Sequence, residues 1–91
     1  MKIRVSINVY GRVQGVAFRH YTRKRARELG VAGWIKNLPD DSVAGLFEGE
    51  ESAVQSLVEW CRYGPPNARV ERIDVRQGVY SGEFDDFDIV Y

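Results

Sequence analysis

Alternating hydrophobic and polar residues predict the strands of this chain. The residues Ile3-Arg4-Val5-Ser6-Ile7-Asn8-Val9 alternate strictly, which is typical of a half-buried strand and predicts one from about Lys2 to Tyr10. Phe87 to Tyr91 alternate as a short final strand, after a loop over residues 78–86. Three further strands are expected between these two, over residues 31–36, 42–48 and 68–77.

Two segments have the hydrophobic spacing of amphipathic helices. The first is expected from about Ala17 to Leu29, ends at Gly30, and presents one apolar face made of Phe18, Thr22, Ala26 and Leu29. The second begins near residues 50–52, whose acidic side chains suit a helix N-terminus, and Gly64-Pro65-Pro66 ends it. Its buried stripe recurs at i, i+3, i+4 and i+7 and consists of Val54, Leu57, Val58 and Cys61.

The order of these elements is βαββαβ with a short extra C-terminal strand, which is typical of the ferredoxin-like α/β sandwich. We therefore expect an α+β fold, with an antiparallel sheet that carries two helices on one face, as a single domain over residues 1–91. In this topology the first two strands are parallel, with the third between them, so their C-terminal ends share one edge of the sheet. The loop after the first strand then lies near Asn37, with about 10 Å between the two backbones.

The link between the first strand and the first helix is Gly11-Arg12-Val13-Gln14-Gly15-Val16-Ala17-Phe18-Arg19. A glycine-containing loop before a helix leaves backbone N–H groups unpaired, and the helix dipole adds positive potential, so this link can hold an anion. Arg19, in the first helical turn, can bind two phosphate oxygens with its planar guanidinium. It remains open at this point that Gly11 and Gly15 are ordinary turn residues and Arg19 a solvated charge. The link is neither a P-loop nor the dinucleotide Gly-x-Gly-x-x-Gly pattern, so a phosphate bound here is small.

Composition excludes several classes of function. The 13 basic and 13 acidic residues cancel, which argues against a broad surface for nucleic acid or anionic membrane, although residues 19–27 concentrate positive charge. The single cysteine cannot form an internal disulfide, no apolar run approaches the roughly 20 residues of a membrane span, and no signal peptide opens the chain. We expect a cytoplasmic protein that needs to be no more than a monomer.

Few side chains are reactive, which limits the chemistry. His20 and Cys61, each the only residue of its type, form no metal-ligand cluster and no nucleophile–base pair, so neither a metal nor a cofactor is expected. We expect His20 to be exposed on the first helix and Cys61 to be packed in the core.

The remaining polar groups near the loop favour one kind of substrate. An anion cradle with one arginine and one asparagine cannot readily cleave the ester of a simple alcohol, because an alkoxide needs a proton or a metal to leave. A carboxylate needs neither, since its conjugate acid has a pKa of about 4. Because the amide of Asn37 can orient a water molecule, the sequence favours hydrolysis of mixed carboxyl–phosphate anhydrides.

Two motifs together resemble those of the acylphosphatase family: Tyr10-Gly11-Arg12-Val13-Gln14-Gly15-Val16-Ala17-Phe18-Arg19 and Gly33-Trp34-Ile35-Lys36-Asn37. Val43-x-Gly45-x-x-x-Gly49 also matches, and the resemblance extends from one end of the chain to the other. It implies metal-independent hydrolysis of acyl phosphates to a carboxylate and inorganic phosphate, without a cofactor. It also implies that Arg19 binds the phosphate, that Asn37 orients the attacking water, and that the cradle's backbone N–H groups come from Gln14, Gly15, Val16, Ala17 and Phe18.

One departure and two alternatives accompany this resemblance. The family usually has glycine where this chain has Asp41. Aspartate tolerates a left-handed conformation less well than glycine, so the geometry of the hairpin turn is the feature that this difference would affect. The main alternative is a non-catalytic ferredoxin-like module that binds nucleic acid or a small anion through residues 19–27 and Tyr21. RNA-binding sheets of this topology stack bases on their central strands, and no matching aromatic motif is present, so no nucleic-acid partner is expected. The second alternative is a small regulatory ligand-binding domain.

Overall fold

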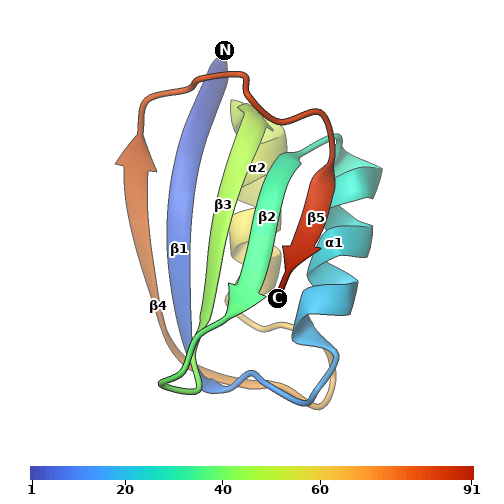
Figure 1. The fold of residues 1–91 in the computed structure, drawn as a ribbon, viewed down its shortest axis with the longest axis vertical. Helices are drawn as coiled ribbons and strands as arrows, with labels where there is room; N and C mark the ends of the chain where they lie inside the picture. The colour runs from blue at the N-terminus through green and yellow to red at the C-terminus, as the bar shows by residue number, and fades with distance from the viewer.

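The computed structural model describes residues 1–91 and contains the expected elements in the expected order. The strands and helices are β1 (Lys2–Arg12), α1 (Phe18–Leu29), β2 (Ala32–Asn37), β3 (Val43–Glu50), α2 (Glu51–Cys61), β4 (Arg69–Gly78) and β5 (Phe87–Val90) (Figure 1). The predicted bounds lie within about two residues of these. Neither helix is long and apolar enough to cross a membrane.

The sheet has the strand order β4-β1-β3-β2-β5. Strands β1 and β2 both run antiparallel to β3, which lies between them, so their C-terminal ends share one edge as predicted. Strand β5 pairs parallel with β2, so the sheet is mixed, and the expected antiparallel arrangement holds only for the first four strands. The reason is that residues 79–86 cross one end of the sheet, the end where β2 begins, and β5 therefore starts beside the start of β2 (Figure 1).

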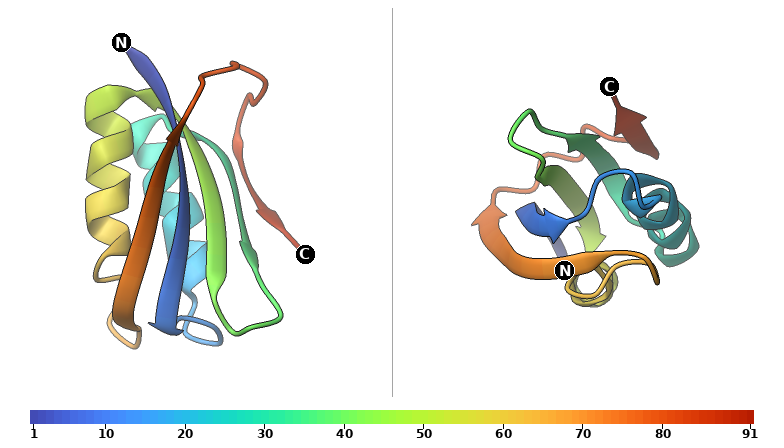
Figure 2. Two further views of the ribbon diagram at one scale, coloured as in Figure 1. Left: turned by 90° about the vertical axis from the view of Figure 1, so that its left-hand side faces the viewer. Right: turned by 90° about the horizontal axis from the view of Figure 1, so that it is seen from below.

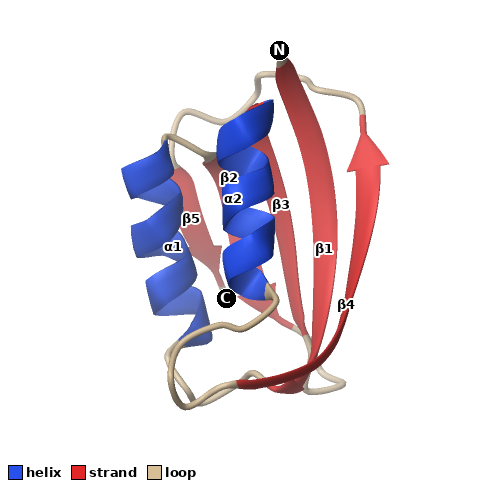
Figure 3. Cartoon of the chain, turned by 180° about the vertical axis from the view of Figure 1, so that it is seen from behind, coloured by secondary structure: helices blue, strands red, loops and turns tan.

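Both helices pack against the same face of the sheet (Figure 2, left; Figure 3). The alternating residues of β1 and the stripe of α2 meet there in a core that includes Ile7, Val9, Val54 and Leu57, each at most 1% exposed. On α1 the residues Phe18, Thr22 and Ala26 are buried, whereas Leu29 is only partly so. Both predicted helix faces and the buried position of Cys61 are thus confirmed.

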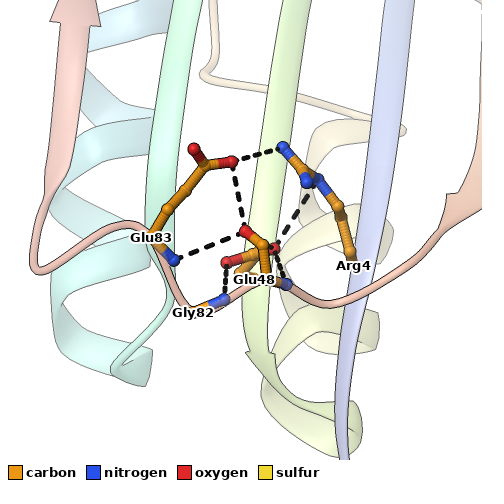
Figure 4. Close-up of polar contacts among 5 residues, drawn as sticks. Arg4, Glu48, Gly82 and Glu83 are labelled. Atoms are coloured by element: carbon orange, nitrogen blue, oxygen red, sulfur yellow. Dashed lines mark hydrogen bonds and ion pairs between the residues drawn. The ribbon is translucent and has the colours of Figure 1, made fainter.

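Glu48 ties the crossing segment to the sheet face that the helices leave uncovered (Figure 4). Its carboxylate is 2% exposed and accepts hydrogen bonds from the backbone N–H groups of Ser81 (2.9 Å) and Gly82 (3.1 Å). Arg4 Nε lies 3.6 Å from the same carboxylate, and Arg4 Nη2 pairs with Glu83 at 3.0 Å. A buried carboxylate that is paired and hydrogen-bonded in this way fixes where the chain crosses the sheet, and so where β5 begins.

Candidate functional site

The loop between β1 and α1 carries unpaired backbone donors. Gly15 (φ 73°) and Ala17 (φ 64°) are both left-handed, and such alternation along a loop turns successive N–H groups toward one side. No backbone N–H of Gln14, Gly15, Val16 or Ala17 donates to an acceptor within the protein. The first N–H groups of α1 also lack intrahelical partners. The loop and the helix tip therefore carry backbone donors without partners, at the place where the sequence predicts an anion site.

Two details of this loop differ from the expectation. Ala17 precedes α1 as its left-handed cap, because a residue with φ 64° cannot begin a right-handed helix. Gly11 lies in β1, at a bulge that follows Tyr10, and is not a turn residue. A Cβ at Gly11 would collide with the backbone oxygen of Arg69, so glycine is needed there for close approach of β1 to β4.

Arg19 lies in the first turn of α1 and is half-buried. Its guanidinium carbon is 5.1 Å from the centroid of the Tyr91 ring, and it takes part in none of the seven ion pairs of the protein. The guanidinium thus lies near an aromatic ring, while its N–H groups have no partner within the protein and are free to bind an oxyanion.

Asn37 is the last residue of β2 and shares the helix-facing side of the sheet with the fully buried Ile35, because side chains two apart on a strand point the same way. Its Oδ1 is buried and has no hydrogen-bond partner. A buried acceptor without a donor costs about 1–3 kcal/mol, so this oxygen is suited to a donor that arrives with the substrate.

A cavity of about 240 Å³ brings these groups together at the end of the sheet where β1 and β2 finish. Besides Gly15 and Ala17 of the loop, it is lined by Arg19, His20 and Arg23 of α1, Asn37 of β2, and Ile89 and Tyr91 of the C-terminal segment. The structure therefore places the two predicted catalytic residues in one cavity, beside the predicted loop. A larger hollow of about 520 Å³, between α2 and β4, contains none of the predicted site residues.

Gln14 contributes a contact that the sequence does not reveal. Its side-chain Nε2 donates to the carbonyl oxygens of Leu38 (2.9 Å) and Ser42 (2.8 Å), in the hairpin between β2 and β3. Within that hairpin the N–H of Leu38 donates to Ser42 O (2.8 Å), and the N–H of Asp41 donates to Leu38 O (3.2 Å). The predicted contribution of Gln14 was its backbone N–H alone, yet its side chain joins the loop to the hairpin that follows Asn37.

Five residues that line the cavity were not among the predicted site residues: Val13, His20, Arg23, Ile89 and Tyr91. Ile89 and Tyr91 reach it because β5 docks parallel to β2, so Phe87, Ile89 and Tyr91 share the face that includes Asn37. The end of β5 accordingly lies beside the end of β2 and the start of α1 (Figure 1). In the sequence, the alternation of residues 87–91 was the only indication that the C-terminal segment could form part of the cavity. His20 is exposed, as expected, and its ring contacts Tyr21 edge-on at 5.0 Å.

The polar groups of the protein offer no cluster of three or more His, Cys, Asp or Glu side chains that could hold a metal ion. The polar groups that line the cavity are the half-buried guanidiniums of Arg19 and Arg23, the exposed imidazole of His20 and the amide of Asn37, beside the backbone donors of the loop. Such a set can hold a phosphate and orient a neutral nucleophile beside it.

The chain is similar in sequence and in fold to known proteins. The family model described as acylphosphatase matches residues 5–89. An acylphosphatase from Geotalea uraniireducens is 56% identical over 91 residues, which is the full length of both chains. The crystal structure of an acylphosphatase from Bacillus subtilis superposes with a TM-score of 0.94 at 40% identity and covers 98% of this chain and 99% of its own. Full-length HypF, solved in a phosphate- and nucleotide-bound form, matches all of this chain with 12% of its own (TM-score 0.87, 26% identity).

Proposed function

The chain belongs to the acylphosphatase family, and from that membership we propose how its cavity performs the reaction. Its full-length relatives are acylphosphatases, so the protein is an enzyme that hydrolyses acyl phosphates to a carboxylate and inorganic phosphate. This sets aside the non-catalytic module and the regulatory domain considered above. The proposal concerns which residues bind the phosphate and which orient the water.

The phosphoryl group binds to the loop and the tip of α1. Backbone N–H groups of residues 14–18 donate to its oxygens, and the guanidinium of Arg19 binds two of them. In support, the loop donors are unpaired and Arg19 has no acidic partner. As the reaction proceeds, charge on the phosphoryl oxygens is stabilised by groups that are already in place.

The attacking water is oriented by Asn37. Its Oδ1 accepts a hydrogen bond from the water, whose oxygen attacks phosphorus from the side opposite the acyl group. The bond between phosphorus and the bridging oxygen breaks, and the electron pair leaves with the carboxylate, which needs no proton. The proton of the water passes to a phosphoryl oxygen, so no protein base is required. The observation that carries this assignment is the buried, unpartnered Oδ1 of Asn37 in the same cavity as Arg19.

The test separates phosphate binding from turnover, with benzoyl phosphate as substrate and inorganic phosphate as competitive inhibitor. Arg19→Ala is expected to lose both turnover and inhibition by phosphate. Arg19→Lys is expected to lose both as well, because a point charge cannot replace the guanidinium fork. Asn37→Ala is expected to lower kcat by about 10²-fold or more while inhibition by phosphate is retained. Arg25→Ala and Asn67→Ala are the matched controls, since both residues are exposed and lie outside the cavity.

Three results would contradict the proposal. Normal turnover by Asn37→Ala would remove the water-orienting role, and normal phosphate inhibition of Arg19→Ala would remove the phosphate-binding role. Loss of wild-type activity in EDTA would show that the reaction needs a metal ion. An alkyl phosphate ester is expected to remain intact under the same conditions, because its alkoxide is a poor leaving group.

A further inference from the structure

Arg23 lies in the catalytic cavity and has no assigned role. It follows Arg19 by four residues on α1, so the two side chains stand on the same face of the helix, about 6 Å apart along its axis. Like charges at this spacing repel each other. A fold that keeps both guanidiniums at one cavity therefore concentrates positive charge there.

No acidic side chain forms an ion pair with Arg23. Arg23 is half-buried and takes part in no ion pair or side-chain hydrogen bond. The next arginine on the same face, Arg27, pairs with Asp86 through Nε (3.1 Å) and Nη2 (3.0 Å). Asp86 also accepts a hydrogen bond from the N–H of Phe87 (2.7 Å), and the charge of Arg23 is the smallest of the effects that lower the pKa of Asp86. No aspartate or glutamate lines the cavity itself.

The cavity opens toward a further basic surface. A neighbouring hollow shares His20 and Arg23 with it and is lined in addition by Lys24, Arg27 and Glu28. The only acidic residue there, Glu28, lies 3.6 Å from Arg25 on the helix. An acyl group that extends from the phosphate along α1 therefore passes Arg23 first and remains in a positive field.

We propose that Arg23 forms a second anion subsite and that the enzyme prefers acyl phosphates whose acyl group carries its own negative charge, such as a carboxylate. This inference rests on the proposed binding of the phosphoryl group at Arg19. The phosphoryl oxygens are bound by the loop and by Arg19, whereas Arg23 lies one helical turn farther from the loop. Its planar fork fits a carboxylate on the leaving group, and a half-buried guanidinium without a partner gains most from such an anion.

The experiment compares 4-carboxybenzoyl phosphate with 4-carbamoylbenzoyl phosphate, two substrates of nearly the same shape that differ by one charge, and uses benzoyl phosphate as reference. For the wild-type protein, kcat/KM is expected to be about tenfold higher for the carboxylate, mainly through a lower KM. In Arg23→Gln this ratio falls to about one, in Arg23→Lys it is intermediate, and in Arg23→Glu it falls below one. Because the ratio is taken within each variant, a change in overall activity cancels.

Arg25→Gln is the matched control, since it removes the same charge from an exposed position of α1 outside the cavity. It is expected to keep the wild-type ratio. Equal kcat/KM for both substrates in the wild type would overturn the subsite even if no Arg23 variant folds. A ratio that falls equally in Arg25→Gln and Arg23→Gln would overturn it in favour of a general charge effect. Failure of the wild type to hydrolyse benzoyl phosphate would instead overturn the proposed function on which the subsite rests.

Discussion

The side-chain amide nitrogen of Gln14 lies 2.9 Å from the carbonyl oxygen of Leu38, so the loop after β1 is fastened to the residue that follows Asn37. The same nitrogen reaches the carbonyl of Ser42 at 2.8 Å, and its two hydrogens are thereby both used. The proposed phosphate-binding loop and the proposed water-orienting residue come from separate elements. Gln14 holds the two at a fixed spacing, which a reaction between bound phosphate and bound water requires.

Replacing Gln14 by Glu puts a carboxylate, which cannot donate, against two carbonyl oxygens. We expect Gln14→Glu to lower the free energy of unfolding by about 2 kcal/mol and to lower kcat, because Asn37 is no longer held in register with the loop. Urea unfolding and benzoyl phosphate turnover measure the two effects. Gln55→Glu, the same change at an exposed position of α2, is the control. Full activity in a stable Gln14→Glu protein would show that this link does not position the site.

Asp41 occupies a left-handed conformation, with φ 72°, in the hairpin that Gln14 holds. Glycine adopts a left-handed conformation with less strain than aspartate. We therefore expect Asp41→Gly to raise the free energy of unfolding by up to about 1 kcal/mol, after allowing for the added freedom of glycine in the unfolded chain. Asp41→Val, which is β-branched, is expected to lower it by a similar or larger amount. Denaturant midpoints of the three proteins give the order, and a glycine variant less stable than the wild type would contradict it.

The parts of the molecule that the sequence predicts are those with local causes. Alternation in β1 and the stripes on α1 and α2 follow from which face of each element is buried, and the topology then brings Arg19 and Asn37 to one edge. These features need no knowledge of distant side chains. The predicted elements accordingly agree with the structure to within about two residues at their ends.

The features that were missed depend on polar contacts between distant segments. Gln14 is hydrogen-bonded to the hairpin, and Glu48 to the segment that crosses the sheet. Nothing in the sequence pattern indicates that these distant segments meet. The parallel docking of β5, which brings Tyr91 over Arg19, follows from that crossing and from the pair between Arg27 and Asp86. The left-handed Ala17 was missed because alanine has no intrinsic preference for that conformation.

Asp86 connects α1 to the start of β5, and its surroundings predict a pH dependence. The backbone N–H of Phe87, followed by the hydrogen bond from Arg27, lowers the pKa of Asp86 below its ordinary value of 3.8. A carboxyl whose folded pKa is depressed stabilises the fold above its unfolded pKa and loses that contribution as the pH falls through the folded one. Asp86→Asn should therefore be less stable than the wild type at neutral pH, and the difference should shrink below about pH 4.

Urea unfolding at neutral pH and at about pH 3 tests this, with the neighbouring exposed Asp85→Asn as control. Asp85 has no ion-pair or hydrogen-bond partner within the protein, so its variant should show little change at either pH. A stability difference for Asp86→Asn that stays constant with pH would exclude titration of this carboxyl as its cause.

The burial of Cys61 predicts a loss of stability at high pH, the opposite of the dependence expected for Asp86. Burial raises the pKa of its thiol to about 12 from an ordinary value of 9.0, against the smaller effect of a hydrogen bond with Thr22. The thiol is therefore protonated and unreactive at neutral pH, and a thiol reagent should modify it only after unfolding. Because the folded pKa lies above the unfolded one, this group's contribution is complete below pH 9 and is lost as the pH rises toward 12. The stability of Cys61→Ala should fall less steeply than that of the wild type over this interval, and equal slopes would contradict the assignment.

Tyr91 is 95% exposed, yet its ring lies 5.1 Å from the guanidinium of Arg19. A ring in this position restrains Arg19 before phosphate arrives, so less conformational freedom is lost on binding. Since an exposed cation–π contact contributes about 0.5–1 kcal/mol, Tyr91→Ala should weaken competitive inhibition by phosphate by about two- to fivefold. Tyr91→Phe should retain wild-type inhibition because the aromatic face is preserved, and Tyr63→Ala, at another exposed tyrosine, should have no effect. If Tyr91→Phe binds phosphate as weakly as Tyr91→Ala, the hydroxyl and not the ring is the part of Tyr91 that acts on the site.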